Sequence, residues 1–229
     1  MPLYDGTKFA NEGVVLVTCN RRLGAEASLY LEPAMGAGVG PGNLGVLDQI
    51  QMLRWLQENI AAFGGDAGNV TLFGQSGGAA AVQALVATPA ARGLVRRVIP
   101  QSGSYAAQRP ESAQRITEFV LKQLAIEPGD LDTLQSVPSS RLAAMYPAIL
   151  ELGLGQPQPY LPVISESMPV HPADAAHSGF GLDLDYLTGS CADEASLFAM
   201  AEGAKPGSHF LQRSEQVLAA GEVDILARN

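Results

Sequence analysis

The chain has 229 residues, of which 47% are hydrophobic, and its formal net charge is −9 at pH 7. This apolar content suffices for a sizeable core, and no basic block offsets the negative charge, which argues against a nucleic-acid partner. No apolar run is long enough to cross a bilayer, and no charged-then-apolar signal opens the chain, so we expect no membrane partner and a cytoplasmic location.

The first half of the chain predicts strands that alternate with helices. Runs rich in β-branched and apolar residues predict buried strands over residues 14–18, 70–73 and 95–99. Apolar residues recur at helical spacing over residues 45–63, and residues 77–87 are small and tolerant of helix, so both segments are predicted helices. This alternation predicts a parallel sheet flanked by helices, that is, an α/β fold.

The second half predicts a helical insertion at about residues 108–158 within a single domain that spans residues 1–229. Proline and glycine breaks divide the chain there and beyond it. The expected elements are helices over residues 111–124, 130–136 and 139–150, a connector over 153–162, a fourth strand over 185–188, and closing helices over 194–200 and 208–220.

The pentapeptide Gly74-Gln75-Ser76-Gly77-Gly78 lies between a predicted strand and a predicted helix. A strand, a sharp turn and a helix in this order are typical of a nucleophile elbow, which presents a serine above a helix N-terminus. We expect a Cβ at Gly74 or Gly78 to collide with the packed strand and helix. An ordinary Gly/Ser-rich turn is the alternative, and the flanking strand and helix favour the elbow.

The residues around the elbow closely resemble the type-B carboxylesterase family of α/β-hydrolases, the cholinesterase-like enzymes. The resemblance runs nearly end to end and is strongest from residue 43 to residue 104. The motifs that carry it are GNLGVLDQ at residues 42–49, LRWLQENIAAFGGD at 53–66, VIPQSGS at 98–104, NRRLG at 20–24 and GSCADE at 189–194.

The resemblance implies an α/β-hydrolase fold and a serine esterase that acts on small carboxylic esters through an acyl-enzyme. Ser76 would be the nucleophile, the N–H of Gly77 would form part of the oxyanion hole, and Glu194 would be the acid of the triad. Ser102 resembles a serine that supports this acid, although a hydroxyl that caps the corner is an equal alternative. By position alone, Glu194 could also be an acid in the first turn of a helix. No cofactor or metal is implied.

Two parts of the family pattern are absent from this sequence. The H-G-G-G loop that supplies other oxyanion donors should precede Tyr4, and a G-x-x-H-G histidine should follow Glu194 by about a hundred residues. We therefore expect an esterase core without its flanks. Of the three histidines present, His209 has the right chain order for a substitute base, whereas His171 and His177 are expected to be surface residues.

The cysteines do not suggest a further site. Cys19 and Cys191 form neither a disulfide framework nor a metal-binding set, and we expect two buried free thiols.

The incomplete pattern also bears on partners and on function. The resemblance implies that a strand is missing between residues 14–18 and 70–73, and another beside residues 185–188. Unpaired strand edges favour a homo-oligomer or pairing with the missing segments. Two alternatives to an esterase remain: a catalytically inactive cholinesterase-like interaction domain, and a truncated gene product without a function of its own.

Overall fold

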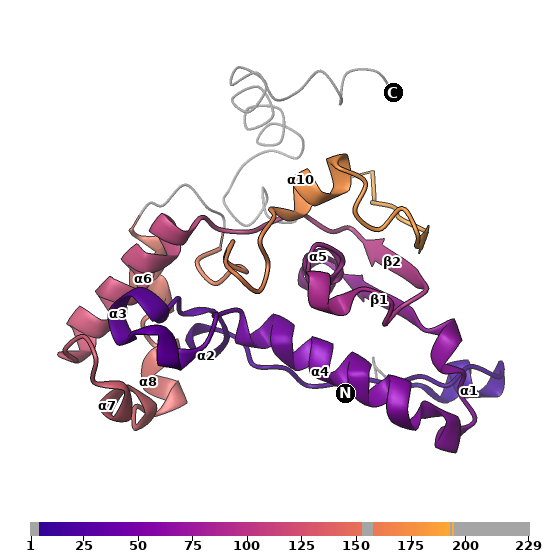
Figure 1. The fold of residues 1–229 in the computed structure, drawn as a ribbon, viewed down its shortest axis with the longest axis horizontal. Coiled ribbons are helices and arrows are strands. Elements are labelled where there is room, and N and C mark those ends of the chain that lie inside the picture. The colour runs from indigo at the N-terminus through magenta and orange to yellow at the C-terminus, as the bar shows by residue number, and fades with distance from the viewer. Residues whose placement is uncertain (1–4, 153–157, 193, 195–229) are drawn as a thin grey trace. The chain divides into compact units, whose positions relative to one another are not determined.

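The structure is a computed structural model that describes residues 5–152, 158–192 and 194 (Figure 1). The chain divides into two compact units, residues 1–188 and residues 189–229, and each is described by itself. The expected single domain over residues 1–229 stays a prediction.

The first unit contains a small parallel sheet. Its strands are β1 (Thr71–Gln75), β2 (Arg97–Gln101) and β3 (Asp185–Tyr186), in the order β1-β2-β3. Both pairs of neighbours are parallel, and Gln75 at the end of β1 is level with Gln101 at the end of β2. The predicted parallel sheet is confirmed, with strand ends that differ by at most two residues from the sequence-based prediction.

Two helices build the main core around this sheet. Helix α4 (Leu44–Asn59), which continues as the 3-10 turn η3 (Ile60–Phe63), and helix α5 (Gly77–Val86) match the predicted helices. Helix α5 packs on both β1 and β2. The buried residues of this core include Val46, Ile50, Leu53, Leu56, Ile60, Ala84, Leu85 and Met168.

Within the predicted helical insertion, the described residues up to 152 form four helices. They are α6 (Pro110–Leu124), α7 (Leu131–Gln135), α8 (Ser139–Ala143) and α9 (Tyr146–Leu150). The prediction of one helix over residues 139–150 is wrong. Pro147 lies in the first turn of α9, and since proline has no N–H to donate to the preceding turn, the helix is interrupted and restarts there.

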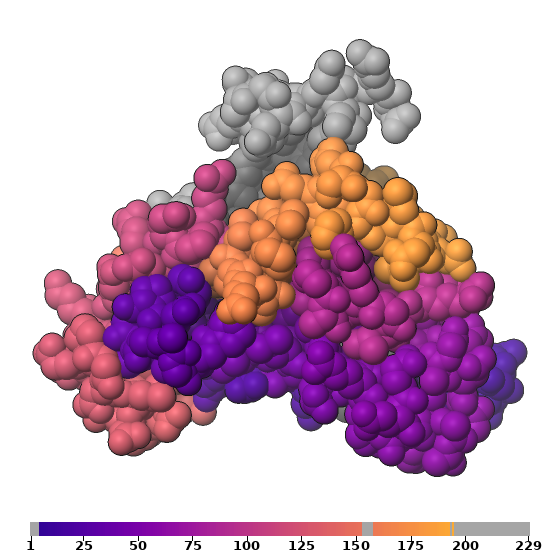
Figure 2. Space-filling model, viewed as in Figure 1, coloured from indigo at the N-terminus to yellow at the C-terminus, as the bar shows by residue number. Residues whose placement is uncertain are grey.

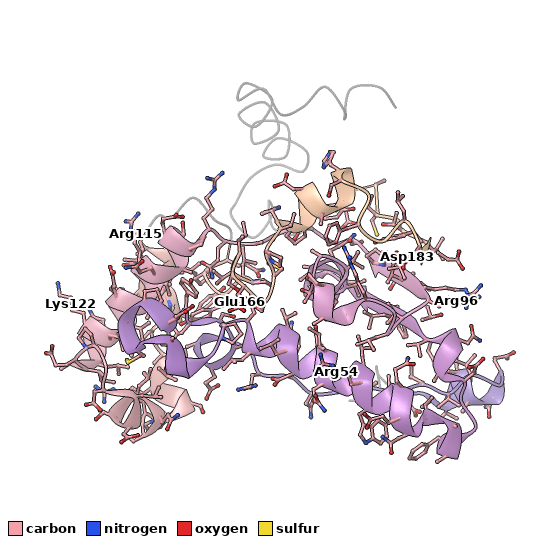
Figure 3. All side chains as sticks on the ribbon, in the orientation of Figure 1. Arg54, Arg96, Arg115, Lys122, Glu166 and Asp183 are labelled. Carbon is pink, nitrogen blue, oxygen red and sulfur yellow. The ribbon has the colours of Figure 1, made fainter. Side chains whose placement is uncertain are left out.

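A second apolar core lies beneath these inserted helices. It joins Ala25 and Leu29 to Ile116, Val120, Leu121, Leu124, Ile126, Leu134, Leu142 and Ile149. The short helices α2 (Ala25–Ser28) and α3 (Glu32–Met35) pack on α8 and α6, and the space-filling view shows the violet surface of α3 next to the pink inserted helices (Figure 2). On the polar side of α6, Arg115 and Lys122 point outward (Figure 3).

The remaining short elements connect these parts of the first unit. They are α1 (Thr7–Asn11), the 3-10 turns η2 (Ala37–Val39), η4 (Ala67–Asn69) and η5 (Pro89–Ala91), and α10 (Pro172–His177).

The strand predicted over residues 14–18 does not form. The segment is exposed except for Leu16, and residues 15–21 make no backbone hydrogen bond to any other described residue. A β-prone sequence becomes a strand only when a neighbouring strand accepts and donates its backbone hydrogen bonds, and none of the described strands lies beside this one. The expected burial of the two thiols is also wrong, because Cys19 and Cys191 are both exposed free cysteines.

Arg22 and Asp48 anchor the end of this extended segment to α4. The Arg22 guanidinium donates from Nη2 to Oδ1 at 2.6 Å and from Nε to Oδ2 at 2.9 Å, and the Arg22 N–H donates to Oδ2 at 2.9 Å. These hydrogen bonds to the charged form hold the pKa of Asp48 below its ordinary value.

Replacing Asp48 with asparagine should lower the free energy of unfolding by about 1 kcal/mol near pH 7, because both side chains of the pair are partly exposed. A carboxyl group with a lowered pKa in the folded state stabilises the fold above its unfolded pKa, about 4, and this stabilisation disappears as the pH falls through the folded pKa. Urea unfolding of the parent and Asp48→Asn chains from pH 7 to pH 3 should show the difference shrinking below about pH 4. Glu58→Gln, at an exposed carboxylate of the same helix, is the control and should show no such trend.

Candidate active site

Ser76 occupies a strained turn between the end of β1 and the start of α5. Its backbone has φ 55° and ψ −118°, a conformation that favours glycine and costs about 1–3 kcal/mol for another residue. The N–H of Ser76 donates to the carbonyl oxygen of Gln101 at 3.0 Å, and its own carbonyl accepts from the Ala80 N–H at 2.9 Å. These bonds tie the turn to β2 and to α5, and they leave Ser76 exposed.

The two glycines of the pentapeptide have different roles. A Cβ on Gly74 would lie 2.5 Å from the carbonyl carbon of Gly78 and 2.6 Å from its oxygen, closer than packed atoms can approach. A Cβ on Gly78 would meet no atom within 4 Å outside the helix's own backbone. The prediction of a collision is therefore confirmed at Gly74 and wrong at Gly78. The strand approaches the helix so closely that only the strand glycine is required.

Gly77 follows Ser76 as the first residue of α5. The N–H groups of the first helical turn have no acceptor within the helix, and the helix dipole favours negative charge beside them. Gly77 is exposed next to the exposed Ser76. Its backbone N–H is therefore available to a negatively charged oxygen that forms at this end of the helix.

Ser102 follows β2 in the same way that Ser76 follows β1. It also has a positive φ, 49°, and it is half-buried. Because Gln75 and Gln101 are register partners at the ends of two parallel strands, both serine turns begin at the same edge of the sheet, where the strands end.

The next residue, Gly103, was missed as a structural requirement of the site. A Cβ there would lie 2.6 Å from the Cβ of Ala79, which is fully buried in α5. The Gln-Ser-Gly sequence after a strand was the available signal. The first unit thus brings Ser76, Gly77 and Ser102 together at the carboxyl ends of two neighbouring strands.

Glu194 belongs to the second unit, and there its side chain organises a local turn. Its Oε1 accepts a hydrogen bond from the backbone N–H of Cys191 at 2.6 Å. The helices predicted over residues 194–200 and 208–220 lie, apart from residue 194, outside the described residues. His209 also lies outside them.

The two described histidines both serve the short helix α10. Nδ1 of the half-buried His171 accepts from the N–H of Ala173 at 3.2 Å and caps the start of the helix. The exposed His177 is the last residue of the helix, and its Nδ1 lies 2.7 Å from the carbonyl oxygen of Ala173, one turn earlier. These contacts support structural roles for both rings.

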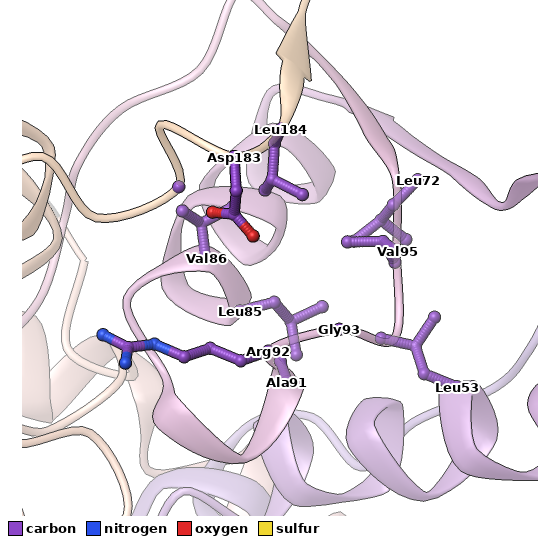
Figure 4. A pocket seen from close by; sticks show the side chains of 11 residues that line it. Leu53, Leu72, Leu85, Val86, Ala91, Arg92, Gly93, Val95, Asp183 and Leu184 are labelled. Carbon is purple, nitrogen blue, oxygen red and sulfur yellow. The ribbon is translucent and has the colours of Figure 1, made fainter. Parts of the chain in front are cut away.

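A small apolar cavity lies between α4, α5 and the loop that precedes β3 (Figure 4). Leu53, Leu72 and Leu85 line it, the carboxylate of Asp183 points toward it, and Arg92 extends away from the other lining side chains. Its volume is about 30 Å³, enough for a water molecule but not for an ester. Ser76 does not line it, so this cavity is not a substrate site for the elbow.

The described residues offer neither a metal-binding group nor a membrane-spanning helix. They contain no group of three histidine, cysteine or acidic side chains that could hold a metal ion. None of the helices that the structure describes has the length and apolar character needed to span a bilayer.

Comparison with known proteins decides the family. The sequence pattern of the carboxylesterase family matches residues 1–223. The chain belongs to the carboxylesterase family. Among the similar proteins, this carboxylesterase-family chain is 37% identical over 204 residues to the para-nitrobenzyl esterase of Bacillus subtilis strain 168, a match that covers 86% of the chain and 41% of the relative. It is 31% identical to an acetylcholinesterase of Leptinotarsa decemlineata over 94% of the chain and 37% of that protein.

Solved structures agree with this assignment. The carboxylesterase EST55 of Geobacillus stearothermophilus superposes with a TM-score of 0.79 at 42% identity, over 88% of this chain and 44% of that enzyme. The α/β-hydrolase fold class expected from the sequence is confirmed. The chain of this carboxylesterase-family member spans less than half the length of each of these proteins.

Proposed function

We propose that this chain carries the nucleophile part of a carboxylic-ester hydrolase, with Ser76 as the nucleophile. The observation that supports this most directly is the strained backbone of Ser76, φ 55°, at an exposed apex between β1 and α5. Strain of this kind persists only where the surrounding structure enforces it, and it concentrates at functional sites. Here the close approach of Gly74 to Gly78 enforces the turn.

In the proposed reaction, Ser76 Oγ attacks the acyl carbon of a small carboxylic ester while its proton passes to a histidine base. The carbonyl oxygen becomes an oxyanion that the N–H of Gly77 stabilises at the start of α5. Collapse of this intermediate expels the alcohol, which takes the proton from the histidine, and leaves an acyl group on Ser76. Water activated by the same base then releases the acid and restores the serine.

Glu194 is the proposed acid that orients the base, and Ser102 is the proposed support for it. A serine hydroxyl at its ordinary pKa is a weak nucleophile, so the reaction depends on that base. Within this sequence His209 is the candidate, since it follows Ser76 and Glu194 in the order Ser, Glu, His. Neither a metal nor an organic cofactor takes part in these steps.

A covalent trapping experiment tests the proposed nucleophile. In a nitrophenyl phosphate triester, Ser76 Oγ should attack phosphorus and displace nitrophenolate. The phosphoryl group then stays on Ser76, because no step that corresponds to deacylation removes it. Peptide mass spectrometry should locate the adduct on the peptide that contains Ser76, and the Ser76→Ala chain should stay unmodified at that peptide. An adduct on another serine of the parent chain would contradict the proposal. An unmodified parent chain would favour the inactive interaction domain instead.

A further inference from the structure

Pro100 is an uncommon residue for its place in the sheet. It lies in β2, the middle strand of the three that the structure describes, and its side chain is almost fully buried. Proline has no N–H to donate to a neighbouring strand, so it is normally confined to edge strands and bulges. A proline at this position therefore removes one hydrogen bond from the sheet.

The register of the strands shows which hydrogen bond is lost. In a parallel sheet, the N–H and C=O groups of every second residue face the same neighbouring strand. The carbonyl oxygen of Val98 accepts from the N–H of Leu187 at 3.1 Å, so the backbone of residue 100, two positions later, also faces β3. The next hydrogen bond would run from the N–H of residue 100 to the carbonyl oxygen of Leu187. Pro100 cannot donate it, and the Leu187 carbonyl accepts no backbone hydrogen bond from a described residue.

A side chain replaces the backbone pairing at this point. Oγ1 of Thr188 donates to the carbonyl oxygen of Pro100 at 3.1 Å. Strand β3 comprises only Asp185–Tyr186, and within the first unit the last backbone hydrogen bond between β3 and β2 is the one that the Leu187 N–H donates. The hydroxyl of Thr188 therefore holds the chain against β2 where the backbone no longer does.

We propose that Pro100 and Thr188 together fix the point at which the chain leaves the sheet on its way to the acid of the site. Pro100 ends the pairing of β2 with β3 after Leu187, and the Thr188 hydroxyl anchors the last residue of the first unit. Glu194 follows six residues later in the chain (194 − 188 = 6). Thr188 is thus a positioning residue that acts through the acid. The proposal rests on the proposed function only for the role of Glu194.

Pro100 also lies next to the residue that anchors the elbow. The carbonyl oxygen of Gln101 accepts from the Ser76 N–H at 3.0 Å, and Gly74 is the register partner of Pro100. The ring of proline fixes its φ near about −65°, which limits backbone motion where β2 holds the elbow. The same residue therefore stiffens the support of the nucleophile on one side of β2 and ends the pairing with β3 on the other side.

Two variants that differ in the hydroxyl group test the role of Thr188. Thr188→Val keeps the branched shape and removes the donor, whereas Thr188→Ser keeps the donor. Hydrogen exchange of the Leu187 amide, followed by NMR in the full 229-residue chain, measures how firmly β3 is held. This amide should exchange about fivefold faster in Thr188→Val than in the parent chain, and at about the parental rate in Thr188→Ser. Parental exchange in Thr188→Val, or faster exchange in Thr188→Ser than in Thr188→Val, would overturn the proposal.

A double-variant cycle tests the role of the proline. In Pro100→Val, the new N–H can donate to the Leu187 carbonyl, so the pairing continues and the Thr188 hydroxyl matters less. In that background, Thr188→Val should change the exchange rate of the Leu187 amide by less than about twofold. The amide of residue 100 should itself exchange at least about a hundredfold more slowly than in an unfolded chain. An unprotected amide at residue 100, or an equal effect of Thr188→Val in both backgrounds, would contradict the proposal. The two Thr188 variants retain Pro100, so their comparison does not depend on the folding of Pro100→Val.

Covalent labelling connects the two residues to the site. The rate at which the nitrophenyl phosphate triester modifies Ser76 should fall at least about fivefold in Thr188→Val and should be close to the parental rate in Thr188→Ser, because a displaced acid no longer orients the base. Equal labelling rates in the three chains would show that Thr188 does not position the acid. A parent chain that is not labelled at all would contradict the proposed function, whereas the exchange measurements would still decide whether Pro100 and Thr188 end the pairing of β2 with β3.

Discussion

Replacing Gly74 with alanine should prevent the elbow from forming and should destabilise the chain by at least about 3 kcal/mol. The new Cβ would lie 2.5 Å from the carbonyl carbon of Gly78, and backbone atoms cannot rotate away as a side chain can. Even overpacking against side chains costs about 1–3 kcal/mol. Thermal unfolding monitored by circular dichroism should show a much lower midpoint or no cooperative transition.

The same exchange at Gly78 is the matched control. Alanine there meets open space in helix α5, and a helical alanine is more favourable than glycine by about 0.5–1 kcal/mol. Gly78→Ala should therefore unfold at the parent temperature or slightly above it. A Gly74→Ala chain as stable as the parent would show that strand and helix are farther apart than the structure places them.

Replacing Ser76 with alanine should reduce the rate at which the chain hydrolyses a short-chain nitrophenyl ester by about a thousandfold or more. The remaining rate should be close to that of the uncatalysed hydrolysis in buffer. The loss follows from removal of the attacking oxygen. Initial rates of nitrophenolate release by the parent and variant chains measure it. Ser140→Ala, at an exposed serine of α8, is the control and should leave the rate unchanged. Equal rates for the parent and Ser76→Ala chains would remove the elbow from the mechanism.

The same assay distinguishes the histidines. If the 229-residue chain hydrolyses the ester, His209→Ala should reduce the rate strongly, whereas His171→Ala and His177→Ala should act only through the stability of α10, whose backbone both rings contact. Loss of activity at His171 or His177 in a chain that remains folded would assign the base to that residue and contradict the proposed order of Ser, Glu and His.

The sequence by itself determined the elements whose information is local. The parallel sheet, helices α4 and α5 and the elbow at Ser76 follow from apolar spacing and from a glycine–serine turn between a strand and a helix, and the structure has each of them. Periodicity works here because each helix or strand buries one face against the same core.

Tertiary structure alone decided the features that depend on a neighbour. Residues 14–18 have a strand's sequence, but no described strand lies beside them, so the backbone of residues 15–18 makes no hydrogen bond to another described residue, and Cys19 is exposed. Gly74 and Gly78 look equivalent in the pentapeptide, yet only Gly74 faces the backbone across the turn, and the need for Gly103 comes from Ala79 in another element. A sequence pattern specifies what a residue prefers, whereas steric contact and hydrogen-bond pairing depend on which atoms the fold places opposite it.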